Sequence, residues 1–229
     1  MKIIAIGDIH GRDAWKKIDV DAFDKVVFIG DFVDSRIISG YEIIQNFKAI
    51  IDLKMSMPEK VVLLLGNHDI HYLFYPDFPQ NGLMKKSQKE LTELFVTNKD
   101  LFQVAYQVKN FLFTHAGISK TWYGENLKYF GSNTISLGNI LNDMYLDEEA
   151  REVLFKAGRL RGGSDSCGGI LWADKSETDD DYLFGYHQIV GHTKVPEIER
   201  YEWANLETSI TYIDVLTESD TFYELTISN

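Results

Sequence analysis

The chain has 229 residues, of which 45% are hydrophobic, so one α/β domain with a sizeable core is the expected organisation. Its 35 acidic residues outnumber its 23 basic ones, and the resulting net charge of −12 disfavours nucleic acid, whose binding depends on Lys and Arg. No apolar stretch approaches the roughly 20 residues that cross a bilayer, and the single cysteine, Cys167, excludes an internal disulfide and indicates a reducing compartment, the cytoplasm.

The first third of the chain alternates short apolar runs with amphipathic segments. Residues such as Ile43, Phe47 and Ile51 recur at the spacing of one helical face. We expect strands at 2–7, 25–30 and 61–66, a short helix near 12–18 and a longer helix at 40–53. This alternation predicts parallel strands that are joined by right-handed crossovers.

The rest of the chain predicts helices at 85–97, 135–144 and 148–157. Runs at 103–108 and 111–114 flank Lys109-Asn110 and predict a hairpin with a two-residue turn. The apolar runs at 210–215 and 221–227 predict a second hairpin at the C-terminal end. The acidic segment 177–181 is expected to be a solvated turn. We therefore expect a single domain over 1–229, in which 119–183 forms an inserted cap of helices and loops because strand signals are weak there.

Five apolar runs end in a short polar motif. These motifs are Gly7-Asp8-Ile9-His10, Gly30-Asp31 with Asp34, Gly66-Asn67-His68-Asp69, Thr114-His115-Ala116-Gly117 and Gly191-His192. Any one of them is also typical of a turn, since Gly permits unusual φ and Asp caps helices. Ligands bind beyond the carboxyl ends of strands in α/β sheets. Five such ends with Asp, His and Asn therefore predict one mixed oxygen and nitrogen metal site.

The ordered set G-D-I-H-G, G-D-F-V-D, G-N-H-D, T-H-A-G and G-H-T resembles the calcineurin-like metallophosphoesterase family over residues 1–215. The branch with the Ser/Thr phosphoprotein phosphatases and bacterial diadenosine tetraphosphatases is the most similar. Residues 115–119 are similar to its H-G-G-L-S segment and residues 171–174 to its L-W-S-D. Lys194 stands where nuclease and phosphodiesterase relatives carry a second histidine. The resemblance implies a four-layer αββα sandwich of mixed sheets.

The resemblance also implies two divalent metal ions, with manganese expected and iron or zinc as alternatives. The implied ligands are Asp8, His10, Asp31, Asn67, His115 and His192, with Asp31 as the bridge between the ions. A metal-activated hydroxide would attack phosphorus directly, without a covalent phospho-enzyme. His68 is implied as the general acid and Asp34 as its orienting carboxylate; the alternative for Asp34 is a turn cap.

The residues that would hold the substrate phosphate depart from the family pattern. Relatives read G-D-x-V-D-R-G, whereas this chain has Ser35 and then Arg36 after Asp34. Arg36, Arg161 in the glycine-rich segment 159–169, and Asn67 are therefore the candidate substrate-binding residues. The alternative for Arg161 is an ordinary surface arginine. A bidentate guanidinium fork tolerates little displacement, so the shift by one position weakens the case for Arg36, and Arg161 is slightly favoured as the clamp.

The leading functional prediction is a phosphomonoesterase of the Ser/Thr protein phosphatase type, acting on a phosphoprotein or a small phosphoester. A dinucleoside polyphosphate or cyclic-nucleotide hydrolase is the first alternative, because such a metal centre serves these substrates as well. The aromatics of the cap have the chemistry either to stack on a base or to pack within the cap. Those aromatics are Trp122, Tyr123, Tyr129 and Phe130. A non-catalytic binding scaffold is the alternative of another class, and the complete set of ligands with Asp34 and His68 argues against it.

Overall fold

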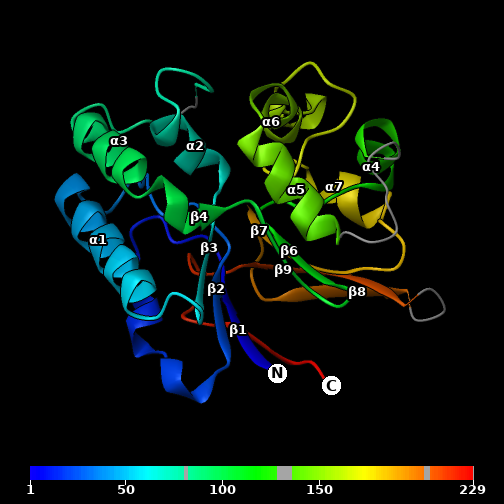
Figure 1. Cartoon of the computed structure of the whole chain (residues 1–229), viewed down its shortest axis with the longest axis horizontal. Coiled ribbons are helices and arrows are strands. Elements are labelled where there is room, and N and C mark those ends of the chain that lie inside the picture. The colour runs from blue at the N-terminus through cyan, green and yellow to red at the C-terminus, as the bar shows by residue number, and fades with distance from the viewer. Residues whose placement is uncertain (80–81, 128–135, 204–206, 229) are drawn as a thin grey trace.

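Two five-stranded sheets lie face to face in the computed structural model, which describes residues 1–79, 82–127, 136–203 and 207–228 (Figure 1). The first sheet has the strand order β10-β1-β2-β3-β4, and the second has the order β5-β6-β7-β9-β8. Helices cover the outer sides of both sheets (Figure 1). The expected sandwich of mixed sheets is confirmed.

The first sheet is built from the alternating segments of the N-terminal third. Its strands are β1 (Lys2–Ile6), β2 (Lys25–Phe28), β3 (Val61–Leu64), β4 (Phe102–Gln103) and β10 (Tyr223–Thr226). Strands β1, β2 and β3 are parallel, as predicted, β4 also runs parallel to β3, and β10 runs antiparallel to β1 at the edge. The carboxyl ends of β1, β2 and β3 consequently open on the same side of the molecule.

The second sheet comprises β5 (Ala105–Val108), β6 (Phe111–Thr114), β7 (His187–Lys194), β8 (Glu199–Trp203) and β9 (Thr208–Asp214). The β5–β6 hairpin is confirmed, with Lys109 at φ 53° in its turn. Strand β7 is parallel to both β6 and β9. Strand β8 was not predicted, because its sequence lacks a continuous apolar run. The strand lies at the sheet edge and is largely exposed.

Two strand predictions are wrong in their pairing. The C-terminal runs do not form a hairpin, since β9 pairs in the second sheet and β10 in the first. The predicted strand 103–108 is divided, because β4 pairs with β3 while β5 pairs with β6. In both cases the apolar pattern indicated a buried strand correctly but did not specify its partner.

Seven α-helices occur in the part of the chain that the structure describes. They are α1 (Gly40–Ser56), α2 (Asn67–Leu73), α3 (Gln88–Thr97), α4 (Lys120–Asn126), α5 (Leu137–Leu146), α6 (Glu148–Phe155) and α7 (Lys175–Asp179). Ser39 and Glu42 form a reciprocal capping box at the start of α1, which fixes where this helix begins.

Two of the predicted segments differ from the structure, and a third lies partly outside the described residues. The predicted helix near 12–18 is a 3₁₀ turn at Ala14–Lys17. The predicted acidic turn at 177–181 overlaps α7, in which Glu177 caps the helix start. The N-terminal residue of the predicted helix 135–144 lies outside the described residues, as do Tyr129 and Phe130.

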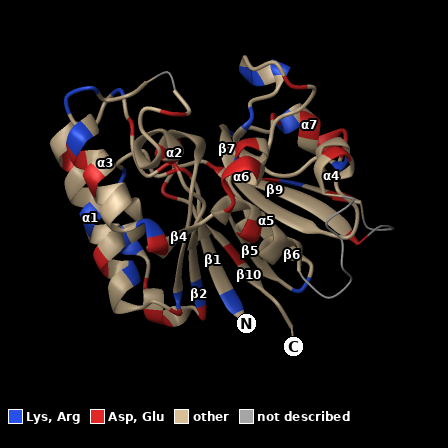
Figure 2. Cartoon of the chain, turned by 45° about the horizontal axis from the view of Figure 1, so that its top comes forward, with Lys and Arg blue, Asp and Glu red and all other residues tan. Residues whose placement is uncertain are grey.

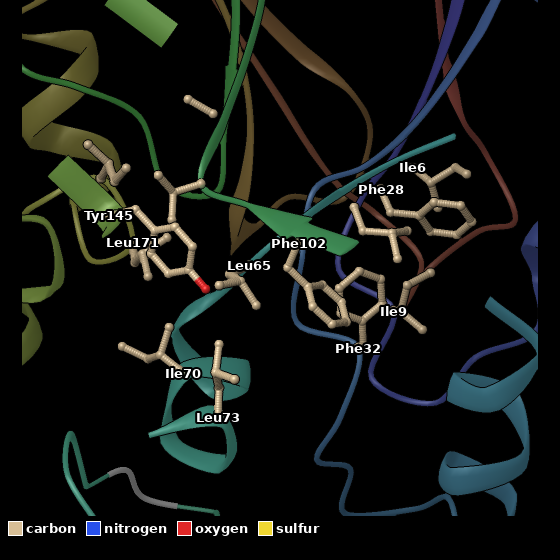
Figure 3. Close-up of a cluster of buried hydrophobic side chains, with 14 of the residues drawn as sticks. Ile6, Ile9, Phe28, Phe32, Leu65, Ile70, Leu73, Phe102, Tyr145 and Leu171 are labelled. Carbon is tan, nitrogen blue, oxygen red and sulfur yellow. The ribbon is translucent and has the colours of Figure 1, made fainter. Parts of the chain in front are cut away.

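The largest hydrophobic cluster joins the outer face of the first sheet to the helices of residues 119–183. Phe28, Phe32 and Phe102 lie together in this cluster, while Tyr145 and Leu171 belong to it from the later segment (Figure 3). A second cluster fills the space between the sheets, with residues such as Val27 and Ile189. Together they hold the strand ends in fixed positions. Within the described ranges, no helix is both long and apolar enough to span a membrane.

Candidate metal centre

The five polar motifs meet at the carboxyl ends of strands from both sheets. Asp8 and His10 follow β1, Asp31 follows β2, Asn67 starts α2 directly after β3, and His115 follows β6. His192 lies in β7, at a register irregularity between Val190 and Lys194. Every ligand in the predicted set therefore lies at this one edge.

Asp31 lies between the imidazoles of the two sheets. Its Oδ2 is 3.5 Å from His10 Nε2 and 3.6 Å from His115 Nε2. His10 Nε2 is also 3.9 Å from Asp8 Oδ2. Two groups of side chains offer ligand atoms within 4.8 Å of one another, His10 with Asp31 and His68, and Asp8 with Asp31 and His115. Asp31 is common to both groups, which is the position that a bridging carboxylate requires.

Asn67 connects the two histidines that come from the second sheet. Its Oδ1 is 3.0 Å from His115 Nε2 and 2.8 Å from His192 Nδ1. His192 Nε2 is buried and has no hydrogen-bond partner among the described residues. A buried nitrogen without a partner is costly, so this atom fits a place where a cation supplies the missing contact.

The other ring nitrogens are fixed by the backbone. His10 Nδ1 lies 2.8 Å from the carbonyl oxygen of Val33, and His115 Nδ1 lies 2.9 Å from that of Ile29. A carbonyl only accepts, so each Nδ1 carries a proton, and each Nε2 is turned toward Asp31. Backbone contacts of this kind set the tautomer of metal-ligating histidines.

Glycine is required beside two of the carboxylates. A Cβ on Gly66 would lie 2.2 Å from Asp31 Oδ1, and a Cβ on Gly191 would lie 2.2 Å from Asp8 Oδ1. Any other residue would fill the space in which the carboxylates converge. The motifs therefore need these two glycines for close approach.

Four non-glycine residues of the site have left-handed backbone conformations. The φ angles are 42° for His10, 51° for Asp31, 63° for Asp34 and 62° for His192. Such conformations are uncommon for non-glycine residues and cost on the order of 1–3 kcal/mol each. Strained residues gathered at one edge are typical of a functional site that the surrounding fold holds in place.

The electrostatics of the site favour bound cations. Burial raises the pKa of Asp8, and the nearby Asp31 raises it further. Although burial alone would raise the pKa of Asp31, His115, His68 and His10 hold it below its ordinary value. Burial lowers the pKa of His192 well below its ordinary value, so its imidazole is neutral. Buried carboxylates beside imidazoles and an amide are a donor set that fits divalent metal ions.

His68 is held by Asp34 beside this cluster. His68 Nδ1 is 2.8 Å from Asp34 Oδ2, and the backbone N–H of His68 donates to Asp31 Oδ1 at 2.9 Å. Burial opposes the charged imidazole, but Asp31 and Asp34 outweigh it and raise the pKa of His68 to about 9. The ring is therefore protonated at neutral pH, which is the form that a general acid requires.

Tyr72 and Asp69 support the site, and the sequence analysis gave neither of them a role. The Tyr72 hydroxyl donates to Asp34 Oδ1 and accepts from the N–H of Met84 at 2.9 Å. Asp69 is completely buried and accepts from the N–H groups of Phe32 and Gly66, both at 2.9 Å. Asp69 thus joins the loops after β2 and β3. His68 and Tyr72 are four residues apart in α2, and this spacing places them on the same face of the helix. A prediction of this helix from the sequence would therefore have pointed to Tyr72.

The two candidate arginines differ in how they are held. Arg161 Nε is 2.8 Å from Asp174 Oδ2, and its Nη2 donates to Thr193 Oγ1 at 2.6 Å. Thr193 follows His192 directly, so the guanidinium lies at the edge of the centre. Arg36 is exposed, and its side chain has no ion pair or hydrogen bond among the described residues. Trp172 packs edge-to-face on His192, with 5.7 Å between ring centroids.

The model of the calcineurin-like phosphoesterase family matches residues 1–205, so the chain belongs to this family. The resemblance that the motifs indicated is confirmed. Membership of this family agrees with the expected enzyme class, a metal-dependent phosphatase.

Relatives in sequence and structure carry phosphatase names. A curated protein of Schizosaccharomyces pombe, named "Putative serine/threonine-protein phosphatase", is 27% identical over 128 residues, which are 51% of this chain and 39% of the relative. This chain thus spans about two fifths of that protein. A cold-active protein-tyrosine phosphatase of a psychrophilic Shewanella superposes with a TM-score of 0.59 at 16% identity, over 98% of this chain and 75% of that one. A protein serine/threonine phosphatase of Saccharomyces cerevisiae gives 0.50 at 16% identity, over 93% and 67%. At these identities the structures show the shared fold alone.

Proposed function

We propose that the protein is a phosphomonoesterase with two divalent metal ions, which hydrolyses a phosphoprotein or a small phosphoester. The observation that carries this proposal is the position of Asp31, which is common to two groups of ligand atoms and adjoins the His68–Asp34 pair. A shared carboxylate next to a protonated imidazole provides both parts that such a hydrolysis needs.

In this proposal Asp8, His10 and Asp31 hold one ion, while Asp31, Asn67, His115 and His192 hold the other. Manganese is the first choice, with iron or zinc as alternatives, because the donors are oxygen and imidazole nitrogen without thiolate. Bound ions of this type lower the pKa of water and neutralise phosphoryl oxygens. We also place the protein in the cytoplasm, which the single, buried Cys167 supports.

In this proposal His68 would protonate the leaving oxygen. With Nδ1 held by Asp34, the His68 ring presents its Nε2 proton to the departing alkoxide. Tyr72 fixes the second oxygen of Asp34, so this carboxylate keeps one orientation. Such preorganisation limits the reorganisation that proton transfer requires.

Three exposed basic residues, Arg36, Lys85 and Lys86, lie in loop segments that adjoin this pair despite the acidic composition. Gly40, which follows Arg36 in the chain, packs against Ser87, which follows Lys85 and Lys86. A Cβ on Gly40 would lie only 2.1 Å from Ser87 Oγ. The loop that precedes α3 carries basic residues in Figure 2. Met84, next to Lys85, contacts Tyr72. These exposed basic side chains would attract an anionic substrate that approaches the site from this side.

We expect Arg161→Ala to lower kcat/KM on a phosphomonoester by about 10- to 100-fold, because a charge-assisted, partly buried contact to phosphate is lost. The ion pair with Asp174 directs this guanidinium, whereas Arg36 lacks a comparable support. Steady-state kinetics of Arg161→Ala and Arg36→Ala, with metal content checked in parallel, would measure the effect. Arg159→Ala removes a cation from the same turn and is the matched control. Wild-type kinetics in both the Arg161 and Arg36 variants would remove these arginines from the mechanism, leaving Asn67 and backbone donors.

A substrate panel on metal-loaded protein tests the proposed function itself. Peptides with phosphoserine, phosphothreonine or phosphotyrosine should be hydrolysed faster than diadenosine tetraphosphate or cyclic nucleotides. Trp122 is buried in the main core, so it does not offer a face to a base as the alternative requires. Faster cleavage of the nucleotides would favour that alternative, and hydrolysis of none of them would favour a binding scaffold.

A further inference from the structure

Asp214 is a buried carboxylate that neither the motifs nor the family resemblance singled out. It is the last residue of β9 and is only 2% exposed. Its Oδ2 is buried and has no hydrogen-bond partner within the described residues, and the carboxylate forms no ion pair there. Burying a carboxylate without a partner is costly, so its retention here needs a physical reason.

The fold places Asp214 at the junction of three strand ends. A Cβ on Gly7 would lie 2.2 Å from the carbonyl oxygen of Ile213 and 3.1 Å from Asp214 Cα, so the end of β1 touches the end of β9. Lys194 of β7 is the register partner of Asp214. Asp8, which follows Gly7, accepts the backbone N–H of His192 at 2.9 Å. Asp214 therefore borders the side of the centre that Asp8 and His192 form.

The charges around Asp214 point to the same centre. Burial raises the pKa of Asp214 to about 9, and Asp8 and Asp31 raise it as well, against weaker opposing effects from Lys194 and Arg12. Arg12 is directed elsewhere, since its guanidinium donates to Ile9 O and Thr217 Oγ1. The strongest charged neighbours of Asp214 are thus the two carboxylates that divalent ions would neutralise.

We propose that Asp214 is a further acidic residue of the metal centre, which stabilises the bound divalent ions as an outer carboxylate behind Asp8. This inference rests on the metal centre of the proposed function. It accounts for a buried, unpartnered carboxylate at a place where cations would balance its charge. Outer partners of metal ligands typically change metal affinity by 10–100-fold when they are replaced.

The test is the affinity of metal-free protein for Mn²⁺, measured by isothermal titration calorimetry on the full chain, together with the Tm of the metal-free form. Asp214→Asn keeps the shape of the side chain and removes its ability to carry a negative charge beside a bound ion. We expect a Kd for Mn²⁺ that is about 10- to 100-fold weaker, and a metal-free Tm that is unchanged or higher because an amide costs less to bury there than a carboxyl group beside two others. Asp52→Asn, at an exposed position on α1, is the control with the same loss of charge and should keep the wild-type Kd.

Two results would overturn the role of Asp214. A Kd within twofold of wild type would show that the carboxylate does not act on the ions. A weaker Kd with a lower metal-free Tm would show that Asp214 is a structural residue of the strand end. These outcomes differ from failure of the proposed function, in which the wild-type protein either binds no Mn²⁺ or binds it and hydrolyses no phosphoester.

Discussion

Replacement of Asp31 by Asn is expected to reduce phosphoester hydrolysis to background and to lower the amount of bound divalent metal. One oxygen ligand and one negative charge would leave the position that both groups of ligand atoms share. Elemental analysis of the purified protein and the rate of phosphate release would measure the two effects. Asp52→Asn again serves as the control for loss of one acidic charge.

The Asn substitution tests charge while it preserves the local structure. Asp31 Oδ1 accepts the N–H of His68 at 2.9 Å, and the amide oxygen of Asn accepts the same bond. The missing Cβ of Gly66 leaves space for either side chain. A wild-type protein without metal above background that keeps full activity in a chelator would refute this prediction.

Replacement of His68 by Asn is expected to lower kcat by about 10²–10⁴ on a phosphoester with a poor leaving group, while the metal content stays intact. His68 and Asp34 form the only hydrogen-bonded imidazole–carboxylate pair at the centre among the described residues, so this variant removes the one imidazole that is bonded to the Asp34 side chain. The loss should be smaller for p-nitrophenyl phosphate, whose leaving group needs little protonation. Steady-state kinetics on both substrates would show the difference.

His187→Asn removes an imidazole that bonds Ser209 in the second sheet, away from the ligands, and provides the matched control. An equal loss on both substrates would exclude the role of His68 as a general acid. A fall in bound metal in His68→Asn would instead make His68 a ligand, as its closeness to His10 and Asp31 permits.

The sequence alone was sufficient for the family, the class of fold and the positions of the metal-competent residues. The reason is local: Asp8, Asp31 and Asn67 each follow a short apolar run, and parallel strands place their carboxyl ends at one edge. The roles of Asp34, His68 and the arginines remain predictions that the proposed variants test. Their geometry supports them, since Asp34 contacts His68 and Arg161 lies beside His192.

Other features were decided only by the tertiary structure. The apolar runs of β9 and β10 look alike in sequence, but they pair in different sheets, because hydrophobic spacing indicates burial without naming a partner. The bond from Tyr72 to Asp34 and the ion pair between Arg161 and Asp174 join segments that no local motif connects. Asp214 reaches the centre only because β9 packs against the end of β1 across the two sheets. Short motifs therefore indicated which residues we propose to hold the metals, and long-range packing decided which charges surround them.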